Sequence, residues 1–122
     1  MIRAILYDKA SGEIVVGGRE LHSQWQQTAE SVLWLDLEGE PEETETPFLL
    51  ETLGLHTLAI QDAQRLRHPP KLESFDDFTF MLLKGLSTEA DGLHFSTVQI
   101  AIFIGERLMV TRRTGDSPGT ET

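Results

Sequence analysis

Residues 95–104 alternate more strictly between two kinds of side chain than any other part of the chain. Val98, Ile100, Ile102 and Ile104 occupy every second position, with Thr97, Gln99, Ala101 and Phe103 between them. Successive side chains of a β-strand point to opposite faces of its sheet, so this period of two predicts a strand. Gly105-Glu106 is a hairpin signal, and residues 107–112 return as the partner strand. The preceding run, 78–86, is almost continuously apolar and predicts a strand covered on both faces.

The N-terminal part predicts further strands. Residues 2–7 and 13–16 flank a turn at 8–12 and together predict a hairpin. Residues 32–37 alternate and predict a third strand. Residues 19–31 have weak helical spacing and are ambiguous between helix and loop.

Two helices are predicted between the third strand and the apolar run. Thr46 suits the N-cap of the first helix and Pro47 its first position, and Gly54 suits the left-handed residue that ends it. The second helix, within 55–66, has an apolar stripe that Asp62 interrupts. Consecutive prolines at 69 and 70 then force extended backbone.

These elements predict one α/β domain. We count about six strands and two or three helices, and the helices between strands three and four require a crossover, so the sheet is mixed. We assign residues 1–114 to the domain and expect 115–122 to be a polar, disordered tail. The predicted core comprises Leu35, Leu53, Leu58, Leu82, Val98, Ile100 and Ile102.

Composition narrows the class of function. The 20 acidic and 10 basic residues give a net charge of -10, which disfavours nucleic acid and anionic membranes and favours cations or a basic partner. There is no cysteine, so thiolate metal sites and disulfides are excluded. We expect no signal peptide and no membrane-spanning segment within these residues.

The residues that carry most enzyme chemistry form no recognisable motif. No serine lies in a nucleophile elbow, and the four histidines form no metal-binding pair. We therefore predict that the chain is not an enzyme. We interpret His56 as a helix-start residue that hydrogen-bonds locally, and the acidic run 36–45 as a solvated loop.

The centre of the chain resembles a known family. The residues that carry the resemblance are Gly54, Leu55, His56, Leu58, Ala59, Ile60, Asp62, Pro70, Lys71, Glu73, Phe75, Asp77, Phe78 and Phe80, in that order. Similar runs occur in the N-terminal cytoplasmic domain of CorA-like divalent cation (Mg2+/Co2+) transporters. The segment 108–113 also resembles the related zinc-transporting (ZntB-type) branch, which stays open as an alternative. Thr57 and Gln61 depart from the family pattern, which usually has proline and an acid there.

The resemblance implies a fold and a function. The fold is an α/β/α sandwich, here lacking its later helices. The function is that of a soluble regulatory domain of a magnesium or cobalt transporter, at the cytoplasmic face of the inner membrane. Such transporters are pentamers whose two C-terminal membrane helices and Gly-Met-Asn signature are absent from these 122 residues. We expect the membrane to be reached only through that missing part.

Asp62 is the metal-site candidate that the resemblance implies. Its counterpart helps to bind a regulatory divalent ion between neighbouring subunits, and Gln61 would weaken such a site because it lacks a charge. We therefore expect no tightly bound cofactor and only weak binding of Mg2+ or another divalent cation. The alternative for Asp62 is an ordinary helix pair with Arg65. The alternative for the chain is a free-standing acidic protein-interaction module.

Overall fold

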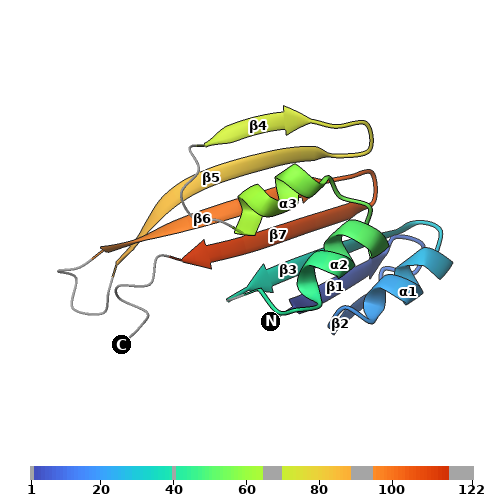
Figure 1. Cartoon of the computed structure of the whole chain (residues 1–122). Helices are drawn as coiled ribbons and strands as arrows, with labels where there is room; N and C mark the ends of the chain where they lie inside the picture. Colours follow the sequence, from blue (N-terminus) through green and yellow to red (C-terminus); the bar gives the residue numbers. More distant parts are fainter. Residues whose placement is uncertain (1, 40, 65–69, 89–94, 116–122) are drawn as a thin grey trace.

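The computed structural model describes residues 2–39, 41–64, 70–88 and 95–115, with side chains described outside 85–97. Its strands form one seven-stranded sheet in the order β2-β1-β3-β7-β6-β5-β4 (Figure 1). The strands are β1 (Ile2–Asp8), β2 (Ile14–Gly17), β3 (Ser31–Glu38), β4 (Lys71–Ser74), β5 (Thr79–Thr88), β6 (Phe95–Ile104) and β7 (Leu108–Gly115). The helices are α1 (Leu21–Gln27), α2 (Glu45–Pro47), the π-helical turn η1 (Phe48–Thr52) and α3 (Thr57–Gln64). The predicted α/β class is confirmed, and β4 is the additional strand.

One parallel pairing joins the two halves of the sheet. Strands β1 to β3 form an antiparallel unit, and so do β4 to β7. Strands β3 and β7 run parallel, with Leu35 opposite Val110. The chain crosses over between these two parallel strands, and the helices between β3 and β4 form part of the connection. Because the sheet has both parallel and antiparallel pairs, the predicted mixed sheet is confirmed.

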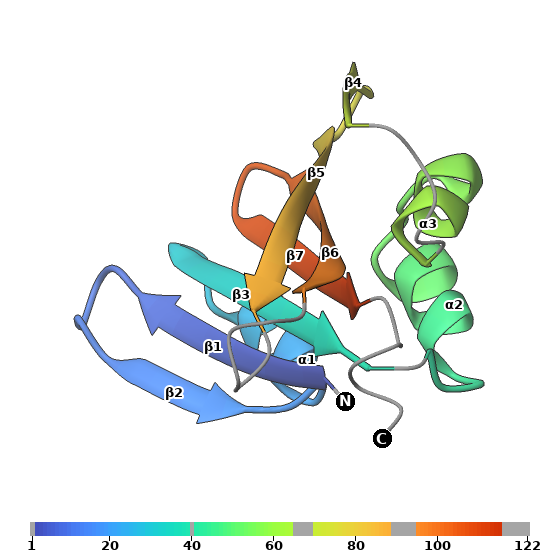
Figure 2. The same cartoon turned by 90° about the vertical axis from the view of Figure 1, so that its left-hand side faces the viewer.

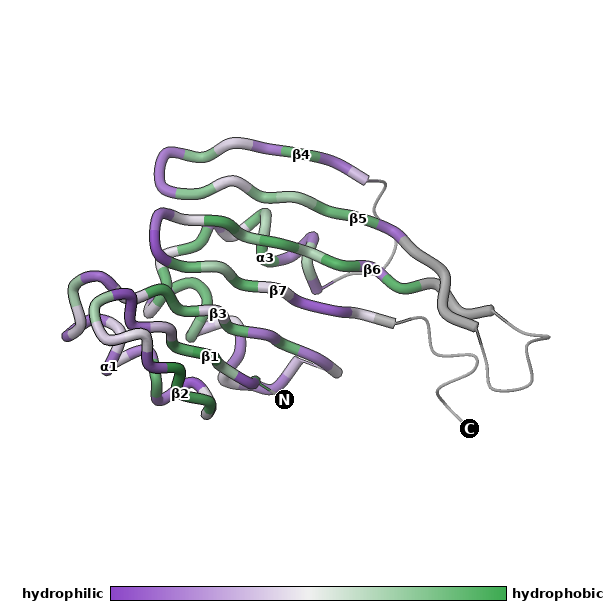
Figure 3. Tube along the Cα trace, turned by 180° about the vertical axis from the view of Figure 1, so that it is seen from behind, coloured by the Kyte–Doolittle hydropathy of each residue, from purple (hydrophilic) through white to green (hydrophobic). Residues whose placement is uncertain are grey.

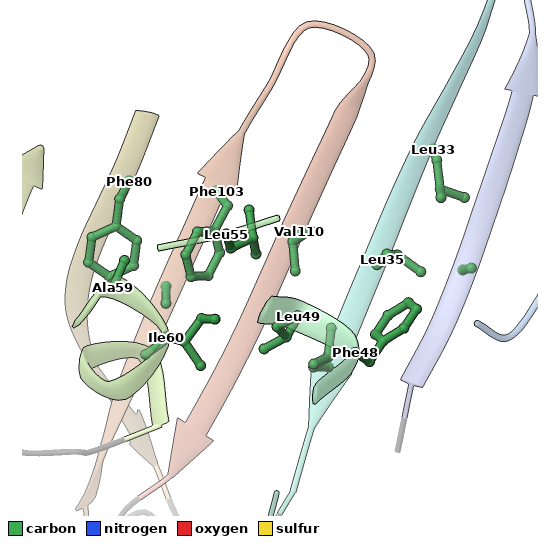
Figure 4. Close-up of a cluster of buried hydrophobic side chains, with 14 of the residues drawn as sticks. Leu33, Leu35, Phe48, Leu49, Leu55, Ala59, Ile60, Phe80, Phe103 and Val110 are labelled. Carbon is green, nitrogen blue, oxygen red and sulfur yellow. The ribbon is translucent and has the colours of Figure 1, made fainter. Parts of the chain in front are cut away.

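The described helices lie against one face of the sheet (Figure 2). This face carries Leu33, Leu35 and Leu37 of β3 together with inward residues of the neighbouring strands, all nearly inaccessible to solvent. The covering side chains include Phe48 and Leu49 before α3, and Ala59 and Ile60 within it (Figure 4). The apolar face of the strands and the apolar stripe of the helix therefore bury each other.

The opposite face of the sheet is less covered, and this corrects the predicted core. On β6 the buried residues are Gln99, Ala101 and Phe103, whereas Val98, Ile100 and Ile102 are only partly buried. Leu83 of β5 is 42% exposed, so the prediction of a strand covered on both faces is also wrong. Hydrophobic residues follow one another along most of the coloured length of β5 and β6 (Figure 3), and successive residues of a strand point to opposite faces, so their pattern gave no sign of which face the helices cover.

The helix boundaries bring further corrections. Helix α2 begins at Glu45 after Thr44, so Thr46 is not the N-cap. Gly54 has a φ of 71°, which confirms the left-handed residue. Leu53 is partly buried and Leu58 is 62% exposed, so neither belongs to the fully buried core.

Two further predictions lie partly or wholly outside the described residues. The proline corner at 69 belongs to the undescribed range 65–69, and so does Arg65. Strand β7 extends through Gly115, one residue beyond the predicted domain boundary. The remaining tail, 116–122, is outside the described residues.

Candidate functional site

Asp62 lies in the last turn of α3, where the helix contacts the sheet. The Gln99 side-chain amide donates a hydrogen bond from Nε2 to the Asp62 carbonyl oxygen at 2.9 Å. The Thr114 hydroxyl likewise donates to the Ala63 carbonyl at 3.2 Å. These bonds hold the end of α3 against β6 and β7, so the Asp62 carboxylate projects from a fixed backbone. Its side chain is 16% exposed.

Lys71 of β4 is a cationic partner of Asp62. Its ammonium contacts Asp62 Oδ2 and lies 3.0 Å from Glu73 Oε1. The same ammonium lies 6.0 Å from the centroid of the Phe80 ring. Hydrogen bonding to Asp62, and then to Glu73, raises the pKa of Lys71 above its ordinary value. The Lys71 ammonium therefore pairs with both Asp62 and Glu73 and links α3 to β4.

The other predicted residues of this segment do not join Asp62 in a cluster. Gln61 is exposed. His56 accepts a hydrogen bond at Nδ1 from the Leu58 amide at 3.1 Å, and its ring stacks on that of Phe75 with 4.8 Å between the ring centroids. The local role predicted for His56 is confirmed. Within the described ranges, no group of three or more His, Cys, Asp or Glu side chains is arranged to hold a metal ion.

The acidic run 36–45 is not simply a solvated loop. Asp36 lies on β3 and pairs with Arg3 and Arg113, at 3.2 and 3.1 Å. Glu45, at the start of α2, is only 2% exposed. The prediction fails at these two acids because basic partners from distant strands reach them.

Glu45 forms a buried ion pair with Arg112 of β7. Arg112 Nε lies 2.9 Å from Glu45 Oε2, and a second guanidinium nitrogen lies 3.1 Å from Oε1. The Arg112 guanidinium also donates hydrogen bonds to the carbonyl oxygens of Gly39, at 2.7 Å, and of Arg113, at 3.1 Å. Gln64 of α3 adds a bond to Glu45 Oε2 at 3.0 Å. This network ties α2, α3 and β7 together.

Sequence reasoning missed this pair, although one signal was present. Arg112 stands two residues after Val110, so alternation places it on the same inward face. A basic residue at an inward strand position requires a buried acceptor. The sequence alone could not tell which of the acids in the run would supply it.

A cavity of about 290 Å³ opens where the β4–β5 and β6–β7 turns meet α1. Trp25, Leu55, Phe78 and Phe103 contribute its apolar lining. Trp25 donates from its indole nitrogen to the Arg107 carbonyl at 3.1 Å, and the Arg107 guanidinium lies over the indole ring. The contacts of Arg107 thus hold α1 against the hairpin.

Comparison with known proteins decides the family. The model of the family described as CorA-like Mg2+ transporter protein matches residues 29–122. The chain belongs to this family. That match spans every element from β3 to β7 and includes Asp62 and Lys71.

Individual relatives agree with the family match. The chain is 35% identical over 86 residues, or 70% of its length, to the putative metal ion transporter YfjQ of Bacillus subtilis. The complete CorA magnesium transporter of Methanocaldococcus jannaschii has a similar fold, with 24% identity over 89% of this chain and a TM-score of 0.63. The soluble domain of the same organism's CorA gives 17% identity over 89% of this chain and a TM-score of 0.62.

The chain spans only part of each of these proteins. It covers 25% of YfjQ, 31% of the complete CorA chain and 39% of the soluble-domain chain. None of the helices described here has the length and apolar character needed to cross a membrane.

Proposed function

We propose that this chain is the cytoplasmic regulatory domain of a CorA-like divalent cation transporter. The observation that carries the proposal is the family match over residues 29–122. The likeness of the fold to a CorA soluble domain, over 89% of this chain, supports it. In this proposal the membrane part and the remaining helices belong to a longer protein, and the assembled transporter is a homo-oligomer, a pentamer as the family resemblance implies.

The regulatory ion in this proposal is Mg2+, and the transported ion is Mg2+ or Co2+. Asp62 supplies carboxylate oxygens, which hard divalent cations prefer. The absence of cysteine excludes a thiolate zinc site, and carboxylate oxygens suit Mg2+. Asp62 supplies at most two of about six oxygens that such an ion needs, so a neighbouring subunit has to complete the sphere.

The reading frame beyond Thr122 tests the proposal cheaply. A transporter requires two apolar stretches of about 20 residues further along the frame. A stop codon directly after Thr122 would contradict the proposal, because no membrane part would then exist on the same chain. Sequencing through the locus therefore distinguishes the two cases before any protein is made.

One observation favours a second candidate, a free-standing acidic interaction module. The sheet face opposite the helices exposes several large apolar side chains, and the chain carries a net charge of -10. Trp34, Leu83 and Ile104 are 38%, 42% and 42% exposed on this face. Exposed apolar surface of this kind marks an interaction site. The stop codon would favour this candidate.

A further inference from the structure

The cavity between the β4–β5 turn, the β6–β7 turn and α1 has an aromatic lining that the proposed function does not use. Both turns and α1 lie at the same end of the sheet (Figure 1). The cavity has a volume of about 290 Å³ and is half open to solvent. Trp25 and Phe78 line it and are partly buried, and Phe103 lines it and is buried. The ring centroids of Phe78 and Phe103 lie 5.8 Å apart, so a small apolar group that enters meets aromatic rings.

Hydrogen bonds within the protein hold this cavity in shape. The Gly105 amide donates to the Leu108 carbonyl at 2.7 Å across the β6–β7 turn. The Phe75 amide donates to the Phe78 carbonyl at 2.8 Å across the β4–β5 turn. The indole bond described above fixes α1 against the first of these turns. A cavity that is already formed binds a ligand without the cost of ordering its walls.

The charged residues that line the cavity favour a cation. Asp77 and Glu106, one from each turn, line it and are both exposed, so they belong to its mouth. Arg107 is the one basic residue among the described residues of the lining. Its guanidinium is already engaged, because it donates to the Ser31 carbonyl at 2.9 Å and lies 4.9 Å from the centroid of the Trp25 ring. Two acids against one base leave the lining negative, in a chain with a net charge of -10.

From these features we propose that the cavity binds a small organic ammonium ion, a protonated amine joined to an aromatic or apolar body. The body contacts Phe78 and Phe103, and the faces of aromatic rings also attract positive charge. The ammonium group stays at the mouth beside the acidic residues Asp77 and Glu106, where a carboxylate would be repelled.

The size of the cavity limits the ligand. A volume of about 290 Å³ is at the lower end of the range for ligand pockets, so the occupant has about ten non-hydrogen atoms. The inference goes beyond the proposed function and does not depend on it, because neither Asp62 nor a metal ion takes part.

The experiment is an NMR titration of the isotope-labelled 122-residue chain with three probes of nearly equal shape. Phenethylamine is a cation at neutral pH, phenethyl alcohol is neutral, and hydrocinnamate is an anion. The indole N–H resonances of the two tryptophans locate the binding, because Trp25 lines the cavity whereas Trp34 lies on the open face of the sheet. The variant Trp34→Phe assigns the two resonances.

The other variants remove the acids and the aromatic ring separately. Asp77→Asn with Glu106→Gln removes both acids at the mouth, and Phe78→Leu removes a ring but keeps an apolar side chain. Glu13→Gln with Glu43→Gln is the matched control, because both glutamates are exposed, neither lines the cavity, and the net charge changes equally. Thermal melts confirm that each variant is folded before it is titrated. If Phe78→Leu does not fold, the variants of exposed acids still decide the outcome.

We expect phenethylamine to shift the Trp25 indole resonance with a Kd of about 1 mM, as suits a ligand of about nine non-hydrogen atoms, and to leave that of Trp34 unchanged. It should bind about fivefold more tightly than phenethyl alcohol, which is the effect of two exposed ion pairs, and hydrocinnamate should bind most weakly. Asp77→Asn with Glu106→Gln should remove this preference, and the control variant should keep it. Phe78→Leu should weaken the binding of all three probes.

Three results would overturn the inference. Equal affinities for the cation and the alcohol, or tighter binding of the anion, would show that the mouth does not select an ammonium ion. A loss of the preference in the control variant as well would assign it to the net charge of the chain. The absence of a saturable shift at Trp25 with every probe would show that the cavity binds no such ligand.

Discussion

Replacing Arg112 by methionine should destabilise the fold severely, because the change leaves the Glu45 carboxylate buried beside an apolar side chain. The Arg112 side chain is 1% exposed and that of Glu45 is 3% exposed. Arg112 makes four hydrogen bonds, two to Glu45 and one each to the carbonyls of Gly39 and Arg113. Removing one partner of a buried ion pair typically costs about 3–5 kcal/mol. Gln64 still donates to Glu45, so we expect the lower part of this range.

The assay is urea unfolding followed by far-ultraviolet circular dichroism, with the intrinsic fluorescence of Trp25 and Trp34 as a second probe. In a thermal melt, a loss of about 3 kcal/mol corresponds to a decrease in Tm of about 10–20 °C for a domain of this size. The double variant Glu45→Met with Arg112→Met should recover part of the loss, since two apolar side chains leave no buried charge.

Arg113→Met is the matched control for this prediction. Arg113 is the next residue on β7, but its side chain is 42% exposed and its partners Asp36 and Glu38 lie on the open face. Exposed pairs contribute about 0–1 kcal/mol, so this variant should remain close to the unmodified chain. Equal losses in Arg112→Met and Arg113→Met would refute the reasoning, because burial of the pair would then have no energetic role.

Three further predictions follow from burial and exposure. Leu82→Ala should lower the free energy of unfolding by about 2–5 kcal/mol because Leu82 is fully buried, whereas Leu83→Ala should lower it by less than about 1 kcal/mol. The midpoints of urea unfolding compare the two variants. Similar losses would contradict the assignment of these residues to opposite faces of the sheet. Burial lowers the pKa of His22 below its usual value of 6.5, so the unfolded chain binds more protons than the folded chain below pH 6.5, and the free energy of unfolding should fall from pH 7 to pH 5. The decrease with pH should be smaller in His22→Gln. An unchanged decrease would exclude His22 as its source. The open sheet face should cause weak dimerisation that Ile104→Lys reduces in sedimentation velocity, whereas a stable pentamer at low concentration would contradict this.

The strands were predictable from sequence because their local signals agree with the fold. The alternation in β6 and the Gly105-Glu106 turn are patterns of consecutive residues. The two strands that flank this turn, β6 and β7, pair with each other as one hairpin. The parallel pairing of β3 with β7 carries no such local signal, because these strands lie more than 70 residues apart. Only the position of helices between the strands indicated a crossover.

The orientation of the sheet was not predictable because apolar residues occupy both faces of β5 and β6. Ile100 and Ile102 are better hydrophobes than Gln99 and Ala101, yet the latter pair is buried. The deciding contacts are tertiary: Gln99 donates to the Asp62 carbonyl at the end of α3. Burial of a polar residue is determined here by an acceptor from another element.

The candidate site was partly visible in the sequence. The family resemblance singled out Asp62, and the same motif contains Lys71 and Glu73. Spacing along the chain did not show that Lys71 lies between Asp62 and Glu73, because residues 65–69, which are outside the described residues, separate α3 from β4 in sequence. The alternative partner of Asp62, Arg65, lies in that range, outside the described residues.

The central claim is that Asp62 is part of an incomplete divalent cation site, and its most direct test is an NMR titration of this chain with Mg2+. Millimolar binding suits this method, and that is the strength expected of a sparse set of oxygen ligands. We predict that shifts of the Asp62 and Lys71 amides saturate in the millimolar range and disappear in Asp62→Asn. Micromolar binding that depends on Asp62 would contradict the claim, because the chain alone would then hold a complete site. Shifts that persist unchanged in Asp62→Asn would contradict it equally.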